Sequence, residues 1–203
     1  FDVDLPISSH ITNFASICFG AIRLLKVKIP HSTDYITKAF NFSSTFEFCS
    51  NLVSVMGFED SPLQDECLVS NIYNNCVSLQ ETDWAIPNAV ISIAGILYNC
   101  ESLKTDVSNI IPKNGFALDN INIENAFGNT KSLTGNIPSN VLWDAGKTFV
   151  SRNMISTFKN SGVAQQAPKC WGGTADDSII KKSAEEKIAE LEERIGILEG
   201  SSL

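Results

Sequence analysis

The sequence predicts an α/β repeat fold: a leucine-rich-repeat solenoid of about six helix–strand units, followed by a short C-terminal coiled-coil helix. Three observations support this expectation. A pattern of apolar residues recurs six times at spacings of 24 to 31 residues, Leu and Pro follow it at regular places, and a heptad pattern begins after the last repeat. Periods of this length are typical of stacked units rather than of one globular core.

Each repeat is centred on a small residue, which we call the anchor. The anchors predicted from the pattern are Cys18, Cys49, Cys76, Cys100, Thr130 and Ser161. Apolar side chains stand seven and three residues before every anchor, as Ile93 and Leu97 do before Cys100. Because this spacing places side chains on one face of a helix, the sequence predicts a helix of about two to three turns before each anchor.

The segment after each anchor predicts a short strand. Leu comes three residues after the anchor in the middle repeats, as Leu103 does, and a Pro such as Pro112 closes many of the units. Pro cannot donate a hydrogen bond within a sheet, so we expect it to end the strand. An Asn before four of the anchors suits a helix end, because Asn tolerates left-handed backbone. The repeats are expected to fill a solenoid domain over residues 1–171.

Two runs of the sequence carry a resemblance to a known family. The runs LYNCESLKTDVSNIIP at 97–112 and AFGNTKSLTGNIPSN at 126–140 resemble the BspA-type leucine-rich repeats, whose signature is an aromatic-x-Asn-Cys-x-Ser-Leu run followed by a Pro. The second repeat departs from this signature at Phe48, where Asn is usual. The resemblance implies a repeat protein of a bacterial surface, of a parasitic protist or of a bacteriophage virion.

The chain beyond the repeats changes character. Residues 172–182 are predicted to form a polar linker, and residues 183–203 a coiled-coil helix for oligomerisation or docking. The core positions and interchain ion pairs expected there involve Ala184, Lys187, Ile188, Leu191, Glu192, Arg194, Ile195, Leu198 and Glu199. We expect a homo-oligomer, a dimer from the Ile and Leu pattern or a trimer by analogy with phage fibres, or docking to another virion protein. A lone amphipathic helix is the alternative.

The six cysteines allow two interpretations. Equivalent positions in a stacked array lie close enough for disulfides. Thr130 and Ser161 replace Cys at two anchors, however, which favours small buried side chains with free thiols. The cysteines do not decide between an oxidising and a reducing compartment.

Composition and charge argue against several classes of binding partner. The chain has 15 basic and 23 acidic residues, a net charge of −8, so nothing indicates attraction to nucleic acid. The longest apolar run, 89–97, has about half of the roughly 18 residues that a membrane helix needs, so no membrane insertion is expected.

Residues that could carry chemistry are few. His10 and His31 are the only histidines and lack metal-ligand spacing. We therefore expect no enzyme, no cofactor and no metal. Trp84 and Trp143 follow anchors, where they could form a recognition surface for a protein or sugar, or could instead cover the edges of the repeats.

These observations predict a non-enzymatic structural or adhesive protein of a virion, such as a phage fibre. It would present its repeat surface for attachment to a host-cell receptor or glycan. The alternative is a bacterial cell-surface or secreted adhesin.

Overall fold

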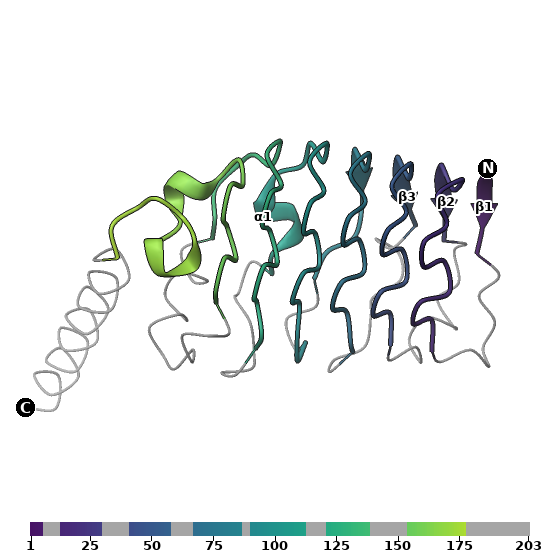
Figure 1. Cartoon of the computed structure of the whole chain (residues 1–203), viewed down its shortest axis with the longest axis horizontal. Helices are drawn as coiled ribbons and strands as arrows, with labels where there is room; N and C mark the ends of the chain where they lie inside the picture. The colour runs from purple at the N-terminus through teal and green to yellow at the C-terminus, as the bar shows by residue number, and fades with distance from the viewer. Residues whose placement is uncertain are drawn as a thin grey trace, which may run out of the picture.

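The computed structural model describes residues 1–5, 13–29, 41–57, 67–86, 90–112, 121–138 and 154–177. The repeats lie side by side in order along one axis, each forming one layer of a stack (Figure 1). We number these layers 1 to 6; they comprise residues 13–29, 41–57, 67–86, 90–112, 121–138 and 154–171.

One edge of the stack is a parallel sheet. Strands β1 (Asp2–Asp4), β2 (Lys26–Lys28), β3 (Ser54–Met56) and β4 (Glu81–Thr82) pair in the order β1-β2-β3-β4. The register aligns Val3 with Val27 and Val27 with Val55. Val27 and Val55 are buried, whereas Lys26 and Lys28 are exposed, because successive side chains of a strand point to opposite faces. The alternating sequence therefore fixes which face of β2 packs on the core.

The predicted helices before the anchors are wrong. In each layer the corresponding segment is a run of consecutive turns, which we call the turn run; in layer 2 it comprises residues 42–49. The only α-helix in the described part of the chain is α1 (Val107–Ile110), and two short 3₁₀ helices, η3 (Ala164–Gln166) and η4 (Lys169–Trp171), lie at the C-terminal end. A leucine-rich-repeat solenoid of helix–strand units is therefore not the fold of this chain.

Backbone hydrogen bonds in the turn run alternate between two kinds of partner. In layer 2 every second N–H group donates to a carbonyl of layer 3; these are the bonds from Phe42, Ser44, Phe46 and Phe48 to Leu68, Ser70, Ile72 and Asn74. The intervening N–H groups, of Thr45, Glu47 and Cys49, close turns by bonding to the carbonyl three residues earlier. Each donor is thus satisfied without a helix, as buried backbone requires.

Left-handed residues explain why the turn run is not a helix. In layer 3, Asn71 and Asn75 have φ angles of 58° and 62°, and every other layer has left-handed residues at the two equivalent positions. A right-handed α-helix needs right-handed backbone angles at every residue, so a left-handed residue every fourth position interrupts it. Gly and Asn adopt left-handed backbone more readily than other residues do. The turns still repeat every three to four residues, so the apolar spacing of the sequence imitates that of a helix.

The apolar register places the core residues correctly in layers 2 to 6. In layer 3 the side chains of Val69, Tyr73, Cys76 and Leu79 are fully buried. Rings at equivalent positions of adjacent layers stack, with centroids 5.1 Å apart for Phe14 and Phe42, 5.7 Å for Phe46 and Tyr73, and 5.1 Å for Phe127 and Phe158. Stacking of like residues therefore joins each layer to the next.

The first repeat is shifted from its predicted register. The N–H of Cys18 donates to Thr45, just as that of Phe46 donates to Ile72, so Cys18 stands three residues before the anchor. The anchor of layer 1 is Ala21, 28 residues before Cys49. Buried Leu24 then takes the place of the Leu that follows the other anchors. The prediction of Cys18 as the anchor of layer 1 is wrong because Cys18 has the same residue type as the next three anchors.

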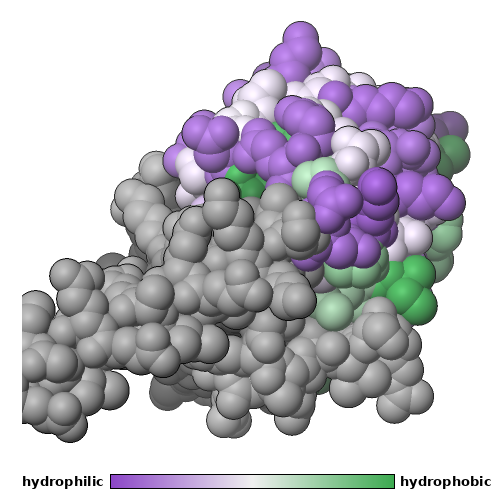
Figure 2. All heavy atoms as spheres, turned by 90° about the vertical axis from the view of Figure 1, so that its left-hand side faces the viewer, coloured by the Kyte–Doolittle hydropathy of each residue, from purple (hydrophilic) through white to green (hydrophobic). Residues whose placement is uncertain are grey.

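The C-terminal end of the stack is covered by the chain itself. Fully buried Trp171 of η4 lies against Phe158 of layer 6, with ring centroids 6.2 Å apart. The side chain of Gln166 accepts from the N–H of Ile137 and donates to the carbonyl of Gly135. Figure 2 looks onto this end, where the described surface is mainly hydrophilic. These contacts close the core at one end.

The first residues of the predicted linker pack against the end of the stack. The N–H groups of Thr174 and Ala175 donate to the carbonyls of Ala164 and Ala167, so residues 172–177 pack against η3 and η4. The predicted coiled-coil residues, 183–203, lie outside the described residues. In the part of the chain that the structure describes, no helix has the length and apolar character to cross a membrane.

Candidate binding surfaces

A charged groove lies over the solvent-facing side of the sheet. It encloses about 460 Å³ and is lined by Asp2, Val3, Asp4, Lys26, Val27, Lys28, Ile29, Ser54, Met56, Gly57 and Asp83. The strand register sets Lys26 beside Asp2 and Lys28 beside Asp4. On the solvent-facing side of the sheet, β1 thus presents two carboxylates and β2 presents two ammonium groups beside them. This arrangement suits the binding of a charged or polar ligand.

Gly57 shapes one wall of this groove. Its N–H donates to the Asp83 carboxylate over 2.5 Å, which joins layer 2 to layer 3. A Cβ at Gly57 would lie 2.1 Å from the carbonyl oxygen of Ile29, and its φ of 106° is unfavourable for any other residue. The wall is therefore held by backbone contacts that only glycine permits.

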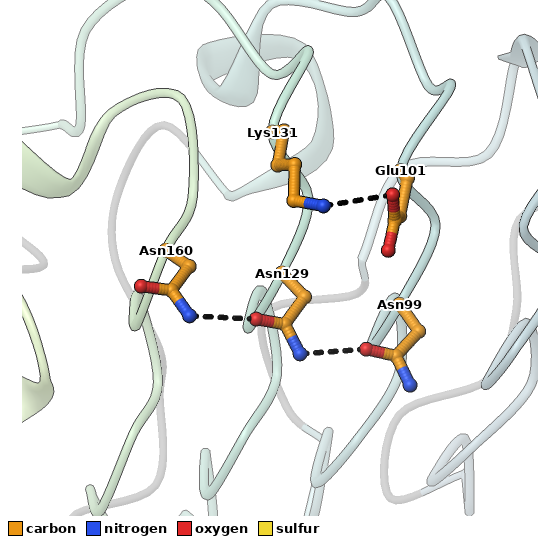
Figure 3. A network of polar contacts seen from close by, with 5 residues as sticks. All are labelled: Asn99, Glu101, Asn129, Lys131 and Asn160. Carbon is orange, nitrogen blue, oxygen red and sulfur yellow. Dashed lines mark hydrogen bonds and ion pairs between the residues drawn. The ribbon is translucent and has the colours of Figure 1, made fainter.

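An asparagine ladder joins neighbouring turn runs, and Figure 3 shows three of its members, Asn99, Asn129 and Asn160. It consists of the residues directly before the anchors in layers 3 to 6. From layer 4 onward, the Nδ2 group of each ladder residue donates to the Oδ1 atom of its counterpart in the preceding layer. The distances are 2.7 Å from Asn99 to Asn75, 2.7 Å from Asn129 to Asn99 and 3.0 Å from Asn160 to Asn129. Because their amides bond to one another, the ladder residues stabilise the stack.

Two further features lie near the ladder. Lys131 and Glu101 form an ion pair of 2.9 Å beside it, but both side chains are about half exposed, so the pair contributes little to stability. A smaller polar hollow of about 170 Å³ is lined by Tyr98, Asn125, Asn129, Ser156, Lys159 and Asn160.

The cysteine anchors lie in the core and bond to the neighbouring layer. The thiols of Cys49, Cys76 and Cys100 each donate over 3.0 Å to a backbone carbonyl of the preceding layer. Thr130 instead donates its hydroxyl within its own layer, to Phe127. These four anchors are small buried side chains that donate a hydrogen bond, whereas Ala21 of layer 1 has no side-chain donor and the Ser161 hydroxyl has no partner among the described residues.

Burial makes these thiols resist ionisation. It raises the pKa of Cys49 to about 11, and it also raises the pKa of Cys76 and Cys100. A buried thiolate would lack both solvation and the hydrogen bond that the thiol donates.

We therefore expect alkaline pH to destabilise the protein partly through Cys49. Its pKa in the fold, about 11, lies above the unfolded value of about 8.5, so the unfolded state loses the proton first. The stabilisation is complete below pH 8.5 and declines as pH rises toward 11, with a slope of up to about 1.4 kcal/mol per pH unit for one proton. In urea titrations from pH 7 to 10.5, Cys49→Ser should lose less stability than the wild type. Equal slopes would contradict this assignment.

One of the two residues predicted for recognition, Trp84, is buried. Trp84 is only 3% exposed and meets Tyr73 edge to face, with ring centroids 6.3 Å apart, so its prediction as a recognition residue is wrong. Trp143 and the nine predicted oligomerisation residues lie outside the described residues. Within the described ranges, no group of three or more His, Cys, Asp and Glu could hold a metal ion.

The groove residues were missed by the sequence reasoning, although a signal was present. Asp2-Val3-Asp4 and Lys26-Val27-Lys28 each alternate a charge with a valine, which is typical of a strand with one solvent-facing side. Their opposite charges also fit adjacent strands.

Comparisons of the chain with protein-family models, curated proteins and solved structures find no match.

Proposed function

We propose that the protein is a non-enzymatic attachment protein of a virion, which binds its target through the charged groove. One observation carries the proposal: adjacent strands hold Asp2, Asp4, Lys26 and Lys28 in fixed rows around a hollow of about 460 Å³. The virion assignment comes from the ending APKCWGGT at 167–174, which precedes the predicted coiled coil and resembles a phage structural protein more than a bacterial adhesin. The resemblance of residues 97–112 and 126–140 to BspA-type repeats fits a virion and a bacterial surface equally.

The rigidity of the groove supports a role in binding. Asp2, Asp4, Lys26 and Lys28 stand on strands whose backbones are paired, so little backbone freedom is lost when a ligand binds. Lys26 and Lys28 are exposed and can form ion pairs with a ligand, while Met56, which is 40% exposed, offers apolar contact. Such a site discriminates by charge pattern and shape.

The test compares two double charge reversals. Lys26→Glu/Lys28→Glu changes the groove, and Lys131→Glu/Lys169→Glu makes the same change in net charge at exposed lysines of layer 5 and η4. The labelled full chain is incubated with a panel of intact bacterial strains and a glycan array. We expect the wild type and the control to bind, and the groove variant to lose at least about tenfold in affinity.

Two outcomes would overturn the proposal. One is equal binding by the groove variant and the wild type. The other is equal loss in both double variants, which would show that only net charge matters.

A further inference from the structure

The polar hollow of about 170 Å³ lies beside the asparagine ladder in layers 4 to 6. The carbonyls of Tyr98, Gly128 and Lys159 accept from the ladder residues of layers 3, 4 and 5, so these three residues occupy the same place in successive layers. Gly128 leaves the middle place without a side chain. A Cβ there would lie 3.0 Å from the Tyr98 ring and 3.2 Å from the carbonyl oxygen of Ser156. The hollow therefore opens where one layer lacks a side chain between Tyr98 and Lys159.

Most of the polar groups that line the hollow are not used by the protein itself. Partners for hydrogen bonds or ion pairs are absent, among the described residues, for the side chains of Tyr98, Asn125, Ser156 and Lys159. These side chains provide two hydroxyls, an amide and an ammonium group, and only Lys159 is fully exposed. Partly buried polar groups that converge on a hollow without protein partners are available to a ligand.

The asparagine ladder ends in this hollow with an acceptor. Asn160 donates through Nδ2 to Asn129, but its Oδ1 atom receives no donor from the described residues. The chain of amides continues from Asn129 through Asn99 to Asn75. Amides that donate in a chain polarise one another, which strengthens the acceptor at the open end. The hollow thus combines a strong acceptor at Asn160 with a group that only donates, the ammonium of Lys159.

This combination selects the kind of ligand. An oxyanion offers only acceptors and would leave the Oδ1 atom of Asn160 unpaired, whereas a cation would be repelled by Lys159. Neighbouring hydroxyls meet both requirements, because each one donates and accepts. A sugar ring carries such hydroxyls, and its apolar C–H groups can pack on the ring of Tyr98.

We propose that the polar hollow binds one uncharged sugar ring of a glycan. One hydroxyl donates to the Oδ1 atom of Asn160, and its neighbour accepts from the Nζ atom of Lys159. Asn125 and Ser156 bind further hydroxyls. The hollow is much smaller than the groove of about 460 Å³, so it takes a single ring rather than a longer chain.

The experiment titrates the full chain with methyl glycosides of glucose, galactose, mannose and N-acetylglucosamine, followed by saturation-transfer difference NMR. We expect at least one glycoside to bind, and sodium sulfate at constant ionic strength not to displace it. Failure of every glycoside to bind would overturn the proposal. Displacement by sulfate would overturn it too, because the hollow would then be an anion site.

A double variant tests whether the sugar lies in the hollow. Ser156→Gly/Lys159→Met removes two of the proposed hydrogen bonds and should weaken binding at least about tenfold. The control is Ser44→Gly/Lys131→Met, which should bind like the wild type. Ser44 and Ser156 both have a φ angle of 58° and are both half-buried, so glycine has the same effect on the backbone at either position. Unchanged binding by the first variant, or an equal loss in both, would contradict the assignment.

This inference does not rest on the groove. The groove variant Lys26→Glu/Lys28→Glu keeps the hollow and should bind the glycoside like the wild type. On the glycan array, a glycan held by the hollow is retained by the groove variant and lost by Ser156→Gly/Lys159→Met. Loss of the glycoside in the groove variant alone would place the sugar in the groove and contradict the proposal, so the two proposals fail separately.

Discussion

Trp171→Ala is expected to destabilise the protein by about 3–5 kcal/mol, the usual cost of truncating a fully buried large aromatic side chain. The indole is 0% exposed and covers Phe158, whose ring it approaches to a centroid distance of 6.2 Å. Its loss would leave a cavity and uncover the last layer of the core, and the neighbouring layers are held by the same kind of stacking. Urea unfolding followed by far-ultraviolet circular dichroism measures the effect without relying on tryptophan fluorescence.

Lys169→Ala is the matched control, because Lys169 is exposed and lies in the same 3₁₀ helix η4. It should change the free energy of unfolding by less than about 0.5 kcal/mol. Trp171→Phe keeps an aromatic ring against Phe158 and should fall between the two. A loss below about 1 kcal/mol for Trp171→Ala would show that the indole does not close the core.

The sequence predicts the buried positions well because burial follows the apolar pattern. Residues seven and three before the anchor, such as Phe42 and Phe46, are buried in layers 2 to 6, and the Leu after the anchor is buried in layers 1 to 5. The backbone conformation is not contained in that pattern. Turns and helices both bring residues three and four apart to one face, so spacing alone does not separate them.

The signal that does separate them lies in the polar residues. Asn41 and Asn122 accept the N–H two residues ahead through their side chains, which starts a turn. Asn71 and Asn125, five residues before their anchors, then adopt left-handed backbone. Together with the Asn directly before the anchor, these positions mark a turn roughly every four residues, a periodicity that a helix interior does not tolerate.

The groove depends on information that a single strand does not carry. Alternation in Asp2-Val3-Asp4 predicts a strand with a polar face, but which strand lies beside it is set by the stacking of layers. The shifted register of layer 1 shows the same limit. Once Ala21 is the anchor, Lys26 aligns with Ser54, and the charged rows follow.

Asn129→Ala should cost about 2–4 kcal/mol, because it combines two losses. Asn129 donates to Asn99 and accepts from Asn160, so the substitution removes both hydrogen bonds at once. Its φ of 58° is also unfavourable for Ala by about 1–2 kcal/mol. Asn129→Gly relieves the backbone term and should cost about half as much. Asn109→Ala, at an exposed position of α1, is the control and should change stability by less than about 0.5 kcal/mol.

Double-mutant cycles then show whether the ladder acts as neighbouring pairs. Asn129→Gly and Asn160→Gly remove the same hydrogen bond, so together they should cost about 0.5–1 kcal/mol less than the sum of the single effects. Asn75→Gly and Asn160→Gly lie at opposite ends of the ladder and should add within about 0.5 kcal/mol. Additivity in both cycles would show that the backbone conformation alone selects Asn before the anchor. Coupling in the first cycle only would show that layers 5 and 6 are joined through their side-chain amides, and the same reasoning then extends to each pair of layers that the ladder spans.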